Sequence, residues 1–136
     1  MATSETSAEA DRVAVDPQSS PEVSIVVPAF NEASRIGESL RQIEAFLKRM
    51  PWRAEVIVVD DGSRDQTSSI ASGMPFPELR LIRNETNSGK GHAVRMGVLA
   101  ATGRYVLFSD ADLSAPIEEL EKLLAVARQQ GADVVI

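Results

Sequence analysis

Cysteine is absent from the 136-residue sequence, which excludes disulfide bonds, thiolate metal ligands and a cysteine nucleophile. Histidine is scarce as well, since His92 is the only one and no second imidazole can share a zinc ion with it. We therefore expect His92 to serve at the surface or in packing rather than in catalysis. Basic residues are not in excess over acidic ones either, since the formal net charge is −6. That balance argues against a nucleic-acid partner, which would select a basic surface.

Long apolar runs are missing too. No segment approaches the roughly 18 apolar residues that span a bilayer. The N-terminus has neither the basic segment nor the apolar core of a signal peptide. Residues 1–21 are instead small, polar and acidic, so we expect a disordered tail there and a folded part over residues 22–136. Together these absences favour a cytoplasmic protein.

Short β-branched runs alternate with helical patterns in the rest of the chain. Short runs rich in apolar and β-branched residues predict parallel strands at residues 23–28, 55–60, 79–84 and 104–110, and the first two are expected to be buried. Apolar residues at helical spacing predict helices at 36–50, 65–71 and 89–103, the last ended by Gly103, and a further helix opened by Pro116. A fifth strand is expected to begin in "ADVVI", and since the chain stops inside it we expect a truncated domain.

This alternation predicts an α/β fold, a Rossmann-like and mainly parallel sheet with helices on both faces. In such sheets ligands bind beyond the carboxyl ends of the strands. Polar residues follow each of the four strands: Asn31 and Glu32, then Asp60 and Asp61, then residues 84–90, then Asp110 and Asp112. We therefore expect the candidate chemistry to gather at one edge of the sheet.

Asp110 and Asp112 end the fourth apolar run, and side chains two residues apart on an extended chain point the same way. Two such carboxylates repel each other. A divalent cation that prefers hard oxygen ligands, Mg²⁺ or Mn²⁺, would bind between them and neutralise this repulsion. The alternative is an acidic helix cap followed by a solvated loop. An EF-hand calcium loop is excluded, because Ala115 stands where that loop needs glycine and a strand precedes it.

Two further loops could bind a nucleotide. In "VVDDGS" a carboxylate of Asp60 or Asp61 could accept hydrogen bonds from a base or a ribose, although a plain turn is the alternative. In "NSGKGHAVR" the glycines allow close backbone approach and Lys90 adds a positive charge at a helix N-terminus, which favours an anion. The alternative for Lys90 and Arg95 is ordinary solvated charge on a helix.

Three stretches carry a resemblance to a known family. They are "VSIVVPAFNEASRIGESL", "EVIVVDDGSRDQT" and "NETNSGKGHAVRMGVLAATGRYVLFSDADLS". Together they resemble the donor-binding half of family 2 glycosyltransferases with the GT-A fold, and most of all the polyprenyl-phosphate and dolichyl-phosphate glucosyl- and mannosyltransferases. The resemblance runs from about residue 23 to residue 136. It implies transfer of a hexose from a nucleotide-diphosphate sugar, UDP-glucose or GDP-mannose, to a polyprenyl or dolichyl phosphate with inversion, at the cytoplasmic face of a membrane.

The resemblance also implies a role for each motif. The first loop would contact the nucleoside, the second would bind its base or ribose, the third would approach the diphosphate, and the D-x-D pair would hold Mg²⁺ or Mn²⁺. The residues concerned are Pro28, Phe30, Asn31 and Glu32; Asp60 and Asp61; Lys90 and Arg95; and Asp110 and Asp112. Several phosphomannose synthases have a glutamine where Ser114 stands here, so water would replace a third side-chain ligand.

Other functions stay open at this point. A response-regulator receiver also pairs "VVDD" with an aspartate after a later strand, but its last strands would need more chain. A sugar-nucleotidyltransferase would need a glycine-rich, arginine-bearing first loop where "PAFNE" stands. A non-catalytic nucleotide-binding module is a further alternative, and we expect the fragment to transfer sugar poorly. An open sheet edge would also allow a homodimer.

Overall fold

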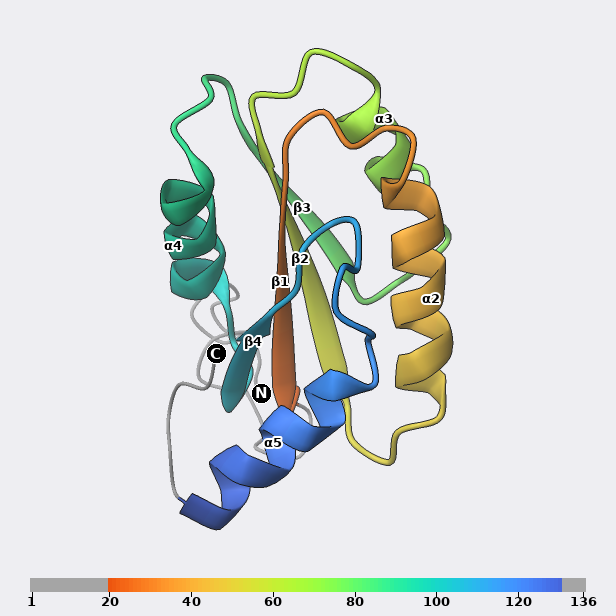
Figure 1. Ribbon diagram of the computed structural model, residues 1–136, viewed down its shortest axis with the longest axis vertical. Helices are drawn as coiled ribbons and strands as arrows, with labels where there is room; N and C mark the ends of the chain where they lie inside the picture. Colours follow the sequence, from red (N-terminus) through yellow and green to blue (C-terminus); the bar gives the residue numbers. More distant parts are fainter. Residues whose placement is uncertain (1–19, 131–136) are drawn as a thin grey trace, which may run out of the picture.

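The computed structural model describes residues 20–130. Most of the predicted tail and the predicted fifth strand lie outside these residues. Within them the chain forms one four-stranded sheet with helices packed against it (Figure 1). The described part therefore covers every other predicted element.

The sheet is entirely parallel, and its strands lie in the order β3-β2-β1-β4. The strands are β1 (Val23–Ala29), β2 (Ala54–Asp61), β3 (Leu79–Asn84) and β4 (Tyr105–Phe108). All seven residues of β1 are buried, because this strand has a neighbour on each side and helices over both faces. The continuous apolar runs thus predicted the central strands correctly.

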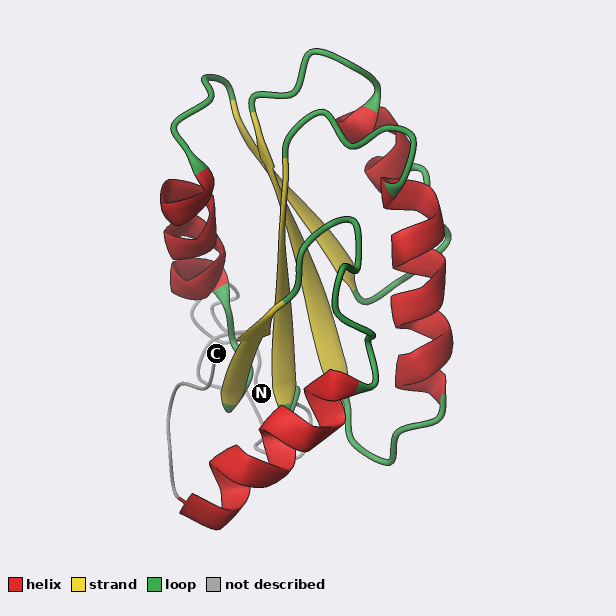
Figure 2. Ribbon diagram, viewed as in Figure 1, coloured by secondary structure: helices red, strands yellow, loops and turns green. Residues whose placement is uncertain are grey.

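Helices cover both faces of the sheet, which confirms the predicted fold class (Figure 2). They are α2 (Ile36–Lys48), α3 (Thr67–Ser72), α4 (Lys90–Ala100) and α5 (Glu119–Gln130). Val23, Ile25 and Val27 of β1 pack towards α2, whereas Val26 packs towards α4, as the alternation of side chains along a strand requires. No helix within residues 20–130 has the length and apolar character needed to cross a membrane.

Two helix boundaries differ by three residues from the sequence-based expectation, and the others by two residues at most. α4 ends at Ala100 and does not continue to Gly103, because the backbone N–H groups of Thr102 and Gly103 donate to Glu55 at 2.7 Å and to Ser24 at 2.8 Å. α5 begins at Glu119 instead of Pro116, since the intervening residues form short i to i+3 turns. At the end of α4, side-chain acceptors that are distant in sequence replace the last helical turn. Before α5, short turns replace the first one.

Gly97 sets the position of α4 on the sheet. A Cβ atom at this residue would lie 2.3 Å from Cγ1 of Val26, so no other residue fits without moving the helix away from β1. This contact holds the N-terminal end of α4, which carries Lys90, at a fixed place beside the carboxyl ends of the strands.

Candidate functional site

A pocket lies where the strand order reverses. The chain proceeds from β1 outward to β2 and β3, then returns to pair β4 with the other side of β1, so the loops after β1 and β4 diverge. The pocket there has a volume of about 520 Å³, which falls within the range of small-molecule sites. Its lining comes from the ends of β1, β2 and β4 and from the start of α4: Pro28, Ala29, Phe30, Glu32, Asp61, Asn87, Gly89, Lys90, Ala93, Asp110, Ala111 and Asp112.

Asp110 and Asp112 reach this pocket from the loop after β4. The Nζ atom of Lys90 lies 2.5 Å from Oδ1 of Asp110, and the hydroxyl of Ser114 is 3.4 Å from Oδ2. Oδ1 of Asp112 accepts the backbone N–H of Ser114 at 3.0 Å, within a turn that places Leu113 in the left-handed region with φ 49°. Both carboxylates are open to the pocket and have acceptor capacity left for a ligand.

This donor set fits a divalent cation that is shared with a ligand. Asp110 and Asp112 offer hard carboxylate oxygens in one pocket. Among residues 20–130 no three acidic or histidine side chains gather into a metal site. The remaining ligands would be water and phosphate oxygens, which is how Mg²⁺ is commonly held beside a substrate phosphate.

Asp61 forms part of the pocket floor and is only 3% exposed. Its carboxylate accepts the backbone N–H groups of Ser88 at 3.0 Å and Gly89 at 2.8 Å, and the side-chain amide of Asn84 at 3.0 Å. Burial raises the pKa of Asp61, but these hydrogen bonds together outweigh burial and hold the pKa below its usual value. The N-terminus of α4 is therefore already occupied by a carboxylate of the protein itself.

Asp60 points to the opposite face of the sheet and does not line the pocket. It is fully buried, and it accepts hydrogen bonds from the backbone of Ser63 at 2.9 Å, from the hydroxyl of Ser68, and from Nη1 of Arg83 at 2.8 Å. Of the two acids in "VVDDGS", the structure brings only Asp61 to the other predicted site residues.

The loop after β1 forms a second wall of the pocket. Pro28, Phe30 and Glu32 line it, and the ring of Phe30 is 44% exposed. Asn31 does not line it; its backbone is left-handed, with φ 53°, and its side chain faces a smaller hollow beside residues 62–64. Three of the four predicted residues of this loop thus share the pocket with Lys90 and the D-x-D pair.

Hydrogen bonds fasten the loop after β1 to the loop after β2. Ser63, Asp65 and Thr67 accept the backbone N–H groups of Asn31, Ala33 and Glu32 at 2.8, 3.1 and 2.9 Å, in that order. The side chain of Asn31 in turn accepts the backbone N–H of Arg64 at 2.9 Å. The motif "DGSRDQT" therefore holds the first loop in place.

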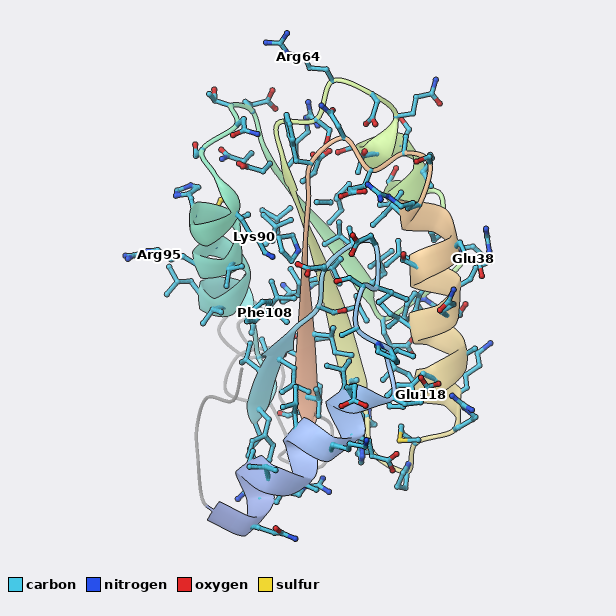
Figure 3. All side chains as sticks on the ribbon, in the orientation of Figure 1. Glu38, Arg64, Lys90, Arg95, Phe108 and Glu118 are labelled. Carbon is cyan, nitrogen blue, oxygen red and sulfur yellow. The ribbon has the colours of Figure 1, made fainter. Side chains whose placement is uncertain are left out.

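The two cations of α4 point in different directions. Lys90 extends towards the sheet and lines the pocket, whereas Arg95 is exposed and points away from it (Figure 3). Arg95 lies five positions after Lys90, and at about 100° per residue this separates the two side chains by about 140° around the helix, so the different directions could be predicted from the sequence. His92 is exposed and does not line the pocket.

Several residues at the site were not singled out from the sequence. Asn84, Ser88 and Arg83 bind the acids after β2, and Asn87, Ala93 and Ala111 line the pocket. The serine and asparagine lie in the already noted stretch of residues 84–90, which was a usable signal. The contact between Arg83 and Asp60 joins residues on neighbouring strands, and no local pattern indicates it.

A family model described as "Glycosyl transferase family 2" matches residues 24–136 of the chain. The dolichyl-phosphate beta-glucosyltransferase of Drosophila melanogaster is 40% identical over 117 residues, which cover 79% of this chain and 36% of that protein. The chain thus spans about a third of the length of the curated relatives that it matches.

Solved structures give the same result. The crystal structure of S. aureus TarS 1-349 in complex with UDP-GlcNAc superposes with a TM-score of 0.65 at 32% identity, over 81% of this chain and 32% of that one. The mannosyltransferase PcManGT from Pyrobaculum calidifontis, in complex with GDP-Man and Mn²⁺, superposes with a TM-score of 0.58 at 32% identity, over 74% of this chain and 34% of that one. The chain is similar to about a third of each of these molecules in sequence and in fold.

Proposed function

The chain belongs to glycosyl transferase family 2, and on that premise we propose that its pocket binds a nucleoside-diphosphate sugar together with a divalent cation. The full activity that we propose is inverting transfer of a hexose, from UDP-glucose in the first place or from GDP-mannose, to a polyprenyl or dolichyl phosphate. One observation carries the proposal: Lys90 and the pair Asp110 and Asp112 line a single pocket at the reversal of the strand order.

The nucleoside would lie against the loop after β1. Pro28 and Phe30 offer an apolar surface on which a base can stack, and Asp61 and Glu32 supply acceptors for base or ribose donors. Glu32 is already held by Arg35 at 2.7 Å, so it is positioned without a ligand. Asn31, Asp60 and Arg95 lie outside the pocket lining, and Asn31 and Asp60 would act through the loops that they hold.

The diphosphate would lie between Lys90 and the D-x-D pair. Asp110 and Asp112 would hold Mg²⁺ or Mn²⁺, which when bound stabilises negative charge on the departing nucleoside diphosphate. Lys90 adds a positive charge at the same place, and its ammonium interacts more strongly with the transition state than with the intact donor. The relatives crystallised with UDP-GlcNAc and with GDP-Man and Mn²⁺ support the binding of a nucleotide sugar and a metal ion.

The acceptor is the less constrained part of the proposal. The Drosophila relative is named for transfer to dolichyl phosphate, and a phosphate acceptor is already mostly ionised near neutral pH, since its second pKa is about 6. Such a nucleophile needs positioning rather than a strong general base. We propose that the reaction takes place at the cytoplasmic face of a membrane, where a lipid phosphate presents its head group.

Calorimetry tests donor binding directly. The chain is titrated with UDP, UDP-glucose, GDP and GDP-mannose, with and without Mn²⁺. We expect binding that depends on Mn²⁺ and that weakens at least about tenfold in Asp112→Asn, the scale of one charge-assisted contact. Glu121→Gln, which removes one exposed negative charge from α5, is the matched control and should bind like the wild type.

The outcomes separate the alternatives. Absence of any nucleotide binding, with or without Mn²⁺, would contradict the proposal. Binding without transfer to a polyprenyl phosphate would restrict the chain to a nucleotide-binding module. Tighter binding of the uracil or of the guanine nucleotides identifies the base of the donor.

A further inference from the structure

We propose that Lys90 acts as an internal counter-cation, which occupies Asp110 in the ligand-free protein and weakens divalent-metal binding until a diphosphate accepts its ammonium group. This inference rests on the proposed function, since it concerns the same pocket. It adds an order to the events there: the metal and the nucleotide each bind weakly alone and strengthen each other.

The geometry of the pair is the starting point. Nζ of Lys90 lies 2.5 Å from Oδ1 of Asp110, closer than any other donor to this carboxylate, while Ser114 reaches only Oδ2 at 3.4 Å. Lys90 is the first residue of α4 and Asp110 follows β4, so the two chain segments meet across the pocket that both line. Figure 3 shows Lys90 extending from α4 towards the sheet. The ammonium thus takes the oxygen that a metal would need.

The charges in the pocket explain why the pair forms. Four carboxylates line it, and two of them have their own partners: Glu32 has Arg35, and Asp61 has backbone N–H groups. Asp110 and Asp112 remain, and Lys90 is the only cationic side chain in the lining formed by the described residues. Lys90 therefore neutralises one of the two carboxylates that would bind a divalent cation directly.

A nucleoside diphosphate changes this balance because it offers Lys90 another anion. Once the ammonium moves to a phosphate oxygen, Asp110 is free to bind the metal, and the metal in turn screens the phosphates from both carboxylates. Binding of each ligand thus improves the site for the other, and by linkage the factor must be the same in both directions.

The expected size follows from the exposure of the pair. The side chains of Lys90 and Asp110 are 59% and 42% exposed, so solvent screens their attraction. Pairs of this kind change an equilibrium by up to about fivefold, and removing the ammonium also removes its repulsion of the metal. We expect Lys90→Met, which keeps the length of the side chain and its helix propensity, to bind Mn²⁺ about three- to tenfold more tightly than the wild type without nucleotide.

Titration with Mn²⁺, followed by the electron paramagnetic resonance signal of the free ion, measures this affinity without any enzymatic turnover. Wild type, Lys90→Met, Lys90→Arg and Lys122→Met are compared, each alone and with saturating UDP or GDP. Lys122→Met is the matched control, because Lys122 pairs with Glu119 at 3.2 Å on α5. Lys90→Arg keeps the positive charge and should keep the weak affinity of the wild type.

The results distinguish the inference from the proposed function. Tighter Mn²⁺ binding in Lys90→Met alone, which disappears or reverses once the nucleotide is present, is the expected result. Unchanged or weaker Mn²⁺ binding in Lys90→Met, while the wild type binds Mn²⁺ and nucleotide together, overturns the inference and leaves the proposed function intact. Failure of all four proteins to bind Mn²⁺ with either nucleotide contradicts the proposed function, and the inference with it.

Discussion

The acids that follow β2 and the acids that follow β4 are of one residue type and lie at the same edge of one sheet, yet their surroundings differ. Asp60 and Asp61 are 0% and 3% exposed, and each accepts hydrogen bonds from three different residues. Asp110 and Asp112 are open to the pocket, and their partners are Lys90 and Ser114. The first pair is enclosed by the protein, and the second faces the space for a ligand.

This difference shows how one sheet edge serves two purposes. A buried carboxylate cannot lose its protein partners cheaply, since a buried polar group without partners costs about 1–3 kcal/mol. Such a group therefore holds loops together. A carboxylate in contact with solvent loses little free energy when a protein partner leaves, because water replaces that partner. It can therefore exchange its partners for a ligand. We thus expect changes after β2 to affect stability and changes after β4 to affect binding.

The largest effect is expected for Asp60→Asn. The amide is neutral and has a single oxygen, so its NH₂ group would face either the N–H of Ser63 or the guanidinium of Arg83, and the ion pair with Arg83 would be lost. We expect a loss of about 3 kcal/mol, less than for a fully buried ion pair because Arg83 is partly exposed. Unfolding in urea measures it. A loss below about 0.5 kcal/mol would show that enclosure of this acid does not stabilise the fold.

Gly62→Ala tests how the second loop encloses Asp61. Gly62 has φ +77°, and a Cβ atom there would lie 2.6 Å from the backbone nitrogen of Asn87. The loop before α4 must therefore move, and with it the N–H groups that bind Asp61. We expect a loss of about 2 kcal/mol in unfolding experiments. Gly91→Ala is the control, since a Cβ there meets nothing within 4 Å and alanine favours the helix.

The pH dependence of stability should report on Asp61. Burial raises its pKa, but the hydrogen bonds from Ser88, Asn84 and Gly89 outweigh burial and lower it in the folded state. A lowered folded pKa gives stability that is present above the unfolded value of about 3.9 and is lost as the pH falls through the folded value. Urea unfolding of wild type and Asp61→Asn across this acidic range should give a flatter curve for the variant. Equal slopes would contradict the prediction.

The smallest effect on stability is expected at the other end of the comparison. Asp112→Asn changes an exposed side chain whose one described partner is the N–H of Ser114 in its own turn. We expect the free energy of unfolding to change by less than about 0.5 kcal/mol. Measured beside Asp60→Asn under the same conditions, this variant carries the same chemical change in the other region. A loss as large as that of Asp60→Asn would remove the distinction between the two pairs.

Local patterns were sufficient for the architecture. The run from Val23 to Pro28 is apolar except for Ser24, because both its faces and both its edges are covered, and a strand of that kind can be predicted without knowledge of its neighbours. The position of Asp110 and Asp112 could also be predicted, because the carboxyl ends of parallel strands lie at one edge of the sheet. These predictions needed only the order of elements along the chain.

The division of roles between neighbouring residues was not readable in the same way. Asp60 and Asp61 point to opposite faces of the sheet, and the partners that enclose them, Arg83, Asn84 and Ser88, come from β3 and the loop after it. Arg95 was grouped with Lys90 by charge, although helical rotation separates them. The sequence therefore predicted where polar groups collect, and the structure was needed to show which of them face the pocket.

The tight contact between Gly97 and Val26 has a consequence for the speed of events at the pocket. Because α4 packs closely on β1 at this contact, Lys90 can leave Asp110 by rotation about its own side-chain bonds, without a shift of the helix. Rotations of partly exposed side chains take picoseconds to nanoseconds, whereas shifts of packed helices take microseconds or longer. The exchange of Lys90 between carboxylate and phosphate should thus be complete long before a bound nucleotide departs, so it adds no slow step to a catalytic cycle.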